Sequence, residues 1–127
     1  MLGRAFLTLG GLVLLGTAAF HATGGPMVAG WLGGERGAVL QMLWYIPTLD
    51  WSVVALAWLL IAWWGNHRLA PLVWILALIP GFAAALVAAT VGPTFLGLWL
   101  LAGATLLAVL GSIALPRATA SPGAPSP

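Results

Sequence analysis

Charged residues are almost absent from this chain, and their scarcity constrains the fold more than any other feature. Four arginines and two acids, with no lysine, make up the 5% of its 127 residues that are charged. A soluble domain of ordinary composition has about 25% charged residues. Because 62% of the residues are hydrophobic, the chain has too few polar side chains to cover a surface that faces water. We therefore expect an integral membrane protein.

The apolar residues are gathered in four stretches that approach the length of a membrane-spanning helix, which is about 20 residues. These predicted spans, separated by breaks rich in glycine and proline, cover residues 5–22, 38–63, 69–90 and 94–115. They predict an all-α integral membrane protein, a four-helix transmembrane bundle that runs up, down, up and down. We assign residues 1–116 to a single membrane domain and residues 117–127, rich in Pro, Ser and Gly, to a disordered C-terminal tail.

The arginines favour an orientation with both termini in the cytoplasm. With four spans, the N-terminus, the loop after the second span and the C-terminal tail share one side of the membrane. That side carries Arg4, Arg68 and Arg117, whereas the other carries Arg36 next to Glu35. Cytoplasmic segments are enriched in Lys and Arg, so the arginine-rich side is expected inside. Arginine without lysine also suggests a GC-rich bacterial genome, and hence a bacterial cytoplasmic (inner) membrane.

Two segments near the N-terminus need separate interpretation. Residues 1–19 could instead be a cleaved signal peptide, because Arg4 precedes the apolar stretch and small residues follow it. Three spans would then remain. Residues 24–37 form the only long connection between spans; we expect it outside, with enough apolar surface to lie at the membrane interface.

Small residues recur on one face of the third and fourth spans. Spaced three, four or seven residues apart, these helix-packing candidates are Gly81, Ala84 and Ala88 in the third span and Gly97, Ala104 and Ala108 in the fourth. Small residues let helix backbones approach, which replaces the hydrophobic attraction that lipid cannot supply. The two spans are predicted to form a closely packed antiparallel hairpin, with a kink at Pro80. The first span carries a weaker version of the same stripe.

Three tryptophans, Trp44, Trp51 and Trp58, lie seven residues apart in the second span. Seven residues are close to two helical turns, so the three indoles share one stripe. Interfacial tryptophans are common, but Trp51 and Trp58 lie too deep for that role. The stripe either fills the bundle or contacts a partner, and we favour these interpretations over a bound cofactor. No cofactor is predicted.

Asp50 is the only acid inside a predicted span. An acid at this depth is costly and normally faces the protein interior or a water-filled cavity. Two interpretations remain open. Asp50 belongs to a polar network or proton pathway, or it caps a helix that restarts after Pro47. Its carboxyl group is expected to be protonated through desolvation or paired.

Other polar residues map to the same outer half of the membrane as Asp50. They are His21, Gln41, Tyr45 and Thr94. Because histidine titrates near neutral pH, a contact between His21 and Asp50 would form a proton-sensitive pair. The alternative is an interfacial histidine among lipid headgroups. Convergence of these groups would create a polar cavity open to the outside.

The residues present exclude several activities and leave three classes open. The chain has no cysteine, no phosphate-binding glycine motif and no basic patch, so thiol chemistry and nucleic-acid binding are not expected. His21 and His67 lie on opposite sides of the membrane, too far apart to hold one haem iron, and no metal site or catalytic residue is assigned. We favour an accessory or structural subunit that assembles with other membrane subunits or with itself. The alternatives are a small transporter, channel or proton pathway around Asp50 and His21, and, less favoured, a membrane enzyme.

Overall fold

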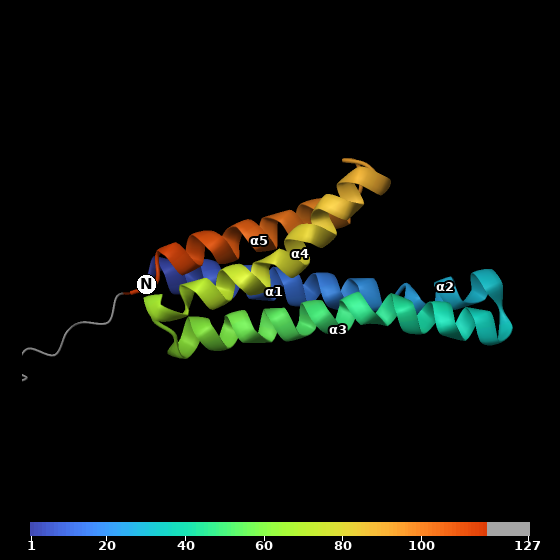
Figure 1. The fold of residues 1–127 in the computed structure, drawn as a ribbon, viewed down its shortest axis with the longest axis horizontal. Coiled ribbons are helices and arrows are strands. Elements are labelled where there is room, and N and C mark those ends of the chain that lie inside the picture. The colour runs from blue at the N-terminus through green and yellow to red at the C-terminus, as the bar shows by residue number, and fades with distance from the viewer. Residues whose placement is uncertain (117–127) are drawn as a thin grey trace, which may run out of the picture.

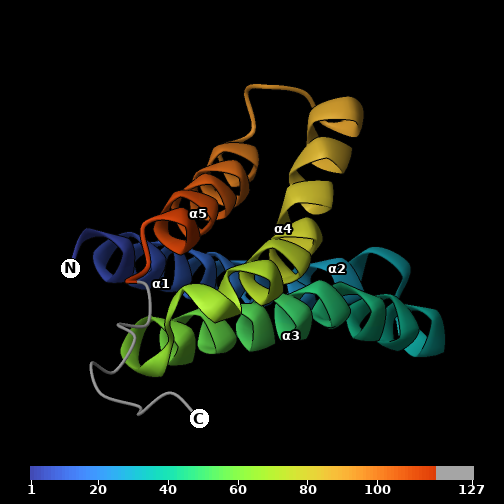
Figure 2. The same cartoon turned by 60° about the vertical axis from the view of Figure 1, so that its left-hand side comes forward.

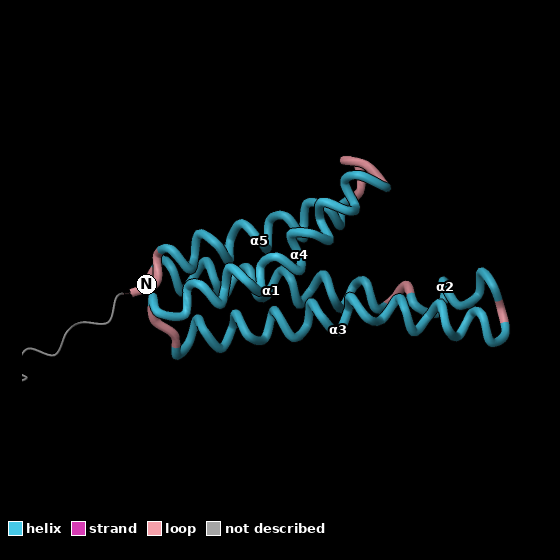
Figure 3. The backbone as a smooth tube through the Cα atoms, viewed as in Figure 1, coloured by secondary structure: helices cyan, strands magenta, loops and turns pink. Residues whose placement is uncertain are grey.

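The computed structural model of the protein describes residues 1–116, and nearly all of them are helical (Figure 1). The elements are α1 (Leu2–Ala22), α2 (Gly25–Leu32), α3 (Gly34–Trp64), the short 3-10 helix η1 (His67–Leu69), α4 (Ala70–Thr90) and α5 (Leu96–Ile113). Within this part of the chain there is no strand (Figure 3), and four helical segments are long and apolar enough to cross a membrane. The predicted all-helical architecture with four apolar helices is confirmed. The predicted tail, residues 117–127, lies outside the described residues.

The connection predicted as a loop over residues 24–37 is helical instead. α2 occupies most of it, and α3 begins at Gly34, before the predicted start of the second span. Pro26 lies in the first turn of α2, where its missing N–H group costs nothing. Gly33 and Gly34 have φ angles of 64° and 49°, a left-handed conformation that glycine adopts without steric cost. The glycines and the proline therefore mark the ends of a helical hairpin rather than an irregular loop.

The two halves of the chain differ in length. The segment Leu2–Leu32, which consists of α1, two connecting residues and α2, contains 31 residues, as does α3. A continuous helix of 31 residues is about 46 Å long. α4 and α5 contain 21 and 18 residues, or about 32 and 27 Å, close to the thickness of a hydrocarbon core of about 30 Å. Figure 1 shows the end formed by α2 and the start of α3 extending beyond the turn between α4 and α5.

α1 is the central helix of the bundle. It packs along both α3 and α5, while α4 packs mainly along α5 and touches α3 over a short stretch. Successive long helices run in opposite directions (Figure 1). α4 and α5 diverge from α1 and α3 as they approach the turn that connects α4 to α5 (Figures 1 and 2). α4 contains Pro80, where a kink is expected, and its second half bends away from α3 (Figure 2). The bundle is therefore open on the side between α3 and α4.

α1 and α5 pack closely through their glycines. A Cβ atom added at Gly10 would lie 3.0 Å from the carbonyl oxygen of Ala104, and one added at Gly111 would lie 2.7 Å from the backbone nitrogen of Leu7. Only glycine permits backbones to approach so closely. The small-residue stripe of α5, which includes the buried Ala104 and Ala108, thus faces the glycines of α1.

The antiparallel α4–α5 hairpin forms, but the predicted small residues differ in how closely they approach the neighbouring helix. A Cβ atom at Gly81 would meet only the Thr105 methyl carbon, at 3.6 Å. Ala84 is buried, but Ala88 is exposed. Gly97, in the first turn of α5, lies against the ring of Phe95, the residue that precedes this helix, and not against α4. The Trp74 indole, on α4, donates a hydrogen bond to Ser112 Oγ, on α5, at 2.7 Å, so it is one of the contacts that join the two helices.

Candidate functional site

Three of the polar residues predicted to converge meet where α1, α2 and α3 join. His21 lies in the last turn of α1, and the chain continues into α2 after two connecting residues. Gln41 and Tyr45 lie one turn apart on α3, and the Gln41 side-chain amide donates to the Tyr45 hydroxyl at 3.2 Å. The tyrosine ring fits over the start of α2 because Gly25 has no side chain there: an added Cβ atom would lie 2.5 Å from the Tyr45 hydroxyl oxygen.

His21 is fixed by two tryptophans of the predicted stripe. Its ring stacks on Trp44, with centroids 4.2 Å apart and planes 8° from parallel, and it meets Trp51 edge-on at 5.0 Å. The Trp44 indole N–H donates to the His21 carbonyl oxygen at 2.8 Å, and His21 Nε2 lies 3.2 Å from the Trp44 carbonyl oxygen. These reciprocal contacts fasten the end of α1 to α3, and we refer to them as the His21–Trp44 clamp.

Asp50 is not part of this cluster. Its side chain is exposed, and the hydrogen bonds of His21 go to Trp44 instead. Successive residues of an α-helix are turned by about 100°, so Asp50 lies on a different face of α3 from Trp44 and Trp51. The hypothesis of a His21–Asp50 pair is therefore wrong in this structure. Pro47 lies inside α3 and does not end it, so Asp50 is not a helix cap either.

Thr94 also lies away from the cluster. It is exposed in the turn between α4 and α5, and Figures 1 and 2 show this turn well separated from α2. The leaning of α4 and α5 explains the separation, because it carries the outer turn away from α1. The polar cavity expected from the sequence is therefore not built by His21, Asp50 and Thr94. The cluster that does form is a packed contact between helices.

The two deeper tryptophans of the stripe lie in the core. Trp58 is fully buried and Trp51 is 7% exposed. The Trp58 indole nitrogen and the Thr48 hydroxyl oxygen are buried without a hydrogen-bond partner in residues 1–116. An unsatisfied buried donor costs about 1–3 kcal/mol of stability. The sequence alone could not show that these two groups are buried without partners. Trp44, the third member of the stripe, is half-buried in the clamp.

Asp50 lies on an exposed face of α3 that is otherwise apolar. The residues of this face, which we name the Asp50 face, recur at helical spacing: Val39, Met42, Leu43, Ile46, Leu49, Asp50, Val53, Leu56 and Leu60. Each of these apolar side chains is more than half exposed. The sequence shows an acid within a long apolar stretch, but it could not show that the acid points out of the bundle.

Comparisons with known proteins assign no family. The sequence matches no protein-family model, and neither a curated protein nor a solved structure matches it. What the protein does is therefore inferred from its own geometry.

Proposed function

We propose that the protein is an accessory or structural subunit of a larger membrane complex, and that the Asp50 face is the surface that binds a transmembrane helix of a partner. The observation that carries this proposal is the exposure of the Asp50 carboxyl group on an otherwise apolar helix face. In this proposal the role of the protein is to hold the complex together, and transport around Asp50 and His21 is the alternative.

The proposal places the four apolar helices in a bacterial cytoplasmic membrane with both termini inside. Helix length and composition support insertion. Arg4 and Arg68 lie on segments at the same end of the bundle. The start of α1 packs against the end of α5, and the His67 N–H of η1 donates to the carbonyl oxygen of Pro116, just after α5. Positive charge marks the cytoplasmic side. In this orientation the end formed by α2 and the start of α3, which carries Glu35 and Arg36, lies outside.

The depth of Asp50 in the membrane makes an unpartnered carboxyl group costly. Asp50 precedes Trp64, the last residue of α3, by about 21 Å along the helix axis, which places it inside a hydrocarbon core of about 30 Å. An ionised aspartate facing lipid near the centre of a span costs about 2.5–3.5 kcal/mol. A partner helix that presents a hydroxyl, amide or basic side chain at this depth would remove much of that cost.

Transport is the weaker interpretation because the polar residues do not line a shared path. His21 and Tyr45 are engaged in packed contacts between helices, and Gln41 bonds to Tyr45 within α3, while Asp50 is exposed. The cavities described in residues 1–116 are lined almost entirely by apolar side chains of η1, α4 and α5. A proton or ion pathway would need these polar groups on one connected surface.

The test is purification of the tagged chain from its native membrane in mild detergent, with mass spectrometry of what accompanies it. We expect a partner at fixed stoichiometry with the wild type. Asp50→Leu should lower its recovery at least about tenfold, since a lost interaction of about 1.4 kcal/mol or more has that effect. Asp50→Asn, which keeps hydrogen-bonding capacity, should retain more of it.

Thr90→Val is the matched control, because Thr90 is another exposed polar residue of a long helix but bonds to its own backbone, at Leu86. It should leave partner recovery unchanged. The proposal is contradicted if the wild type purifies alone and vesicles containing it carry a proton or cation flux that disappears in Asp50→Asn. That result would support the transport alternative.

A further inference from the structure

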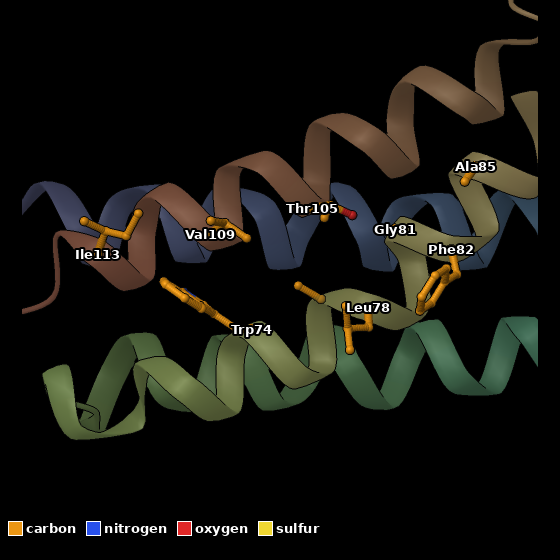
Figure 4. A pocket seen from close by; sticks show the side chains of 9 residues that line it. Trp74, Leu78, Gly81, Phe82, Ala85, Thr105, Val109 and Ile113 are labelled. Atoms are coloured by element: carbon orange, nitrogen blue, oxygen red, sulfur yellow. The ribbon is translucent and has the colours of Figure 1, made fainter.

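Two adjoining apolar pockets lie along α4 and α5, one beside η1 and one toward the middle of the bundle, and we refer to them together as the α4–α5 groove. Figure 4 shows the pocket toward the middle of the bundle. The two pockets have volumes of about 520 and 590 Å³ and share Trp74 and Ile113. α4 contributes Gly81 and Phe82 to the walls of the groove and α5 contributes Thr105. The groove reaches His67 at its η1 end.

Small residues and one long side chain create this groove. Ala77, Gly81 and Ala85 follow one another at four-residue spacing on the side of the groove formed by α4. Because their side chains are small, they fill little of the space beside this helix. The Trp74 indole reaches from α4 to α5, donates a hydrogen bond to Ser112 Oγ at 2.7 Å and lines both pockets. Small residues here do not draw the two backbones together. They leave space that another molecule can fill.

The lining of the groove offers almost no hydrogen-bonding group. The Thr105 hydroxyl donates to the Leu101 carbonyl oxygen at 2.8 Å, and the Thr105 methyl carbon is the atom nearest to Gly81. The Ser112 hydroxyl, which is buried beside Trp74, accepts from the Trp74 indole and donates to the Val109 carbonyl oxygen. An occupant of the groove therefore has to be hydrocarbon along its length.

The mouth of the groove differs from its interior because polar and basic residues lie near it. His67 lines it, Arg68 follows in η1, and both are exposed. Arg4, also exposed, lies at this end of the bundle because Gly3 packs against Ala114. No acid occurs in η1, α4 or α5.

We propose that the groove between α4 and α5 binds an acyl chain of an anionic phospholipid, whose phosphate lies against His67 and Arg68. Basic residues at the cytoplasmic end of a groove between membrane helices bind anionic headgroups, and the apolar lining suits the chain. The distance from His67 to Phe82 is about 22 Å along the helix, more than the depth of one leaflet, about 15 Å. This inference rests on the membrane insertion proposed above but not on a partner at the Asp50 face.

The test measures which lipid the purified protein retains. The full chain is reconstituted in vesicles of equimolar phosphatidylglycerol and phosphatidylcholine, extracted in mild detergent and weighed by native mass spectrometry. We expect the wild type to keep phosphatidylglycerol at least fivefold over phosphatidylcholine. Arg68→Ala should bring this ratio close to one without changing the groove. Gly81→Leu, which places a side chain in the groove, should lower retained lipid at least tenfold.

Gly103→Leu is the matched control, since Gly103 lies on α5 with no atom within 4 Å of an added Cβ. It should retain lipid like the wild type. Equal retention of the two lipids by the wild type, or equal loss in Gly81→Leu and Gly103→Leu, overturns the proposal. So does a wild-type dimer that Gly81→Leu converts to a monomer with unchanged lipid retention, because a second copy would then fill the groove.

The two proposals fail in different ways. Loss of the partner in the Asp50 experiment leaves the lipid measurement unaffected. Release of the wild type from membranes by alkaline carbonate contradicts the insertion on which both proposals depend.

Discussion

Gly111→Ala is expected to destabilise the protein strongly, whereas Gly103→Ala, on the same helix, is not. A Cβ atom at Gly111 would lie 2.7 Å from the Leu7 backbone nitrogen and 2.9 Å from the Gly3 carbonyl oxygen. These are backbone atoms of α1 and cannot rotate away, so the helices have to separate. Overpacking of this kind costs about 1–3 kcal/mol, a large fraction of the stability of a small domain.

Thermal unfolding in detergent, followed by circular dichroism, measures this difference. Gly103 has open space around it, so alanine there should be neutral or stabilising by about 0.5–1 kcal/mol through its helix propensity. Equal melting temperatures of the two variants would contradict the close packing of α1 on α5. A large effect at Gly111 would also favour α1 as a retained membrane span over a cleaved signal peptide, because the fold would then depend on it.

Trp44→Ala is expected to have the second large effect, because it removes the His21–Trp44 clamp. The variant loses the ring stack at 4.2 Å and the indole hydrogen bond to the His21 carbonyl oxygen. We expect a loss of about 3 kcal/mol, the lower end of the range for truncating a buried aromatic side chain, since Trp44 is half-buried. Chemical unfolding in detergent micelles, monitored by tryptophan fluorescence and circular dichroism, gives the free-energy difference.

Two further variants separate the parts of the clamp. Trp44→Phe keeps an aromatic ring for stacking but lacks the indole donor, so it should lose about 1 kcal/mol. Trp63→Ala is the control for removing a tryptophan of α3, because Trp63 is 71% exposed; its effect should stay within about 0.5 kcal/mol. If Trp44→Ala is as harmless as Trp63→Ala, the clamp does not hold α1 to α3.

The helices themselves could be predicted because apolar stretches of span length allow few other structures. α1, α4 and α5 lie within a few residues of the predicted spans. The partners of each helix could not be predicted, since α1, α4 and α5 all carry small-residue stripes and a stripe does not identify its counterpart. α2 was missed because Gly24, Gly25, Pro26, Gly33 and Gly34 are typical of a loop, although here they lie at or next to helix ends.

The candidate site was predictable only in part for a similar reason. Any helical conformation keeps Gln41, Trp44 and Tyr45 near one another, because they are close in sequence. His21 lies in the last turn of α1, the helix that packs beside them. The direction of Asp50 depends on how α3 is rotated about its axis. α3 is apolar on nearly every side, so hydrophobic periodicity could not determine that rotation and could not show that Asp50 is exposed.

Site-specific photocrosslinking from the Asp50 face tests the central claim most directly. A photoreactive amino acid replaces Val53, which is 64% exposed next to Asp50 on this face, or Leu106, which is 59% exposed on α5. After irradiation of native membranes, we expect one defined protein adduct from position 53, its loss when Asp50→Leu is added, and none from position 106. Adducts with lipid alone from position 53, or the same protein adducts from both positions, would contradict the assignment of the Asp50 face as a subunit interface.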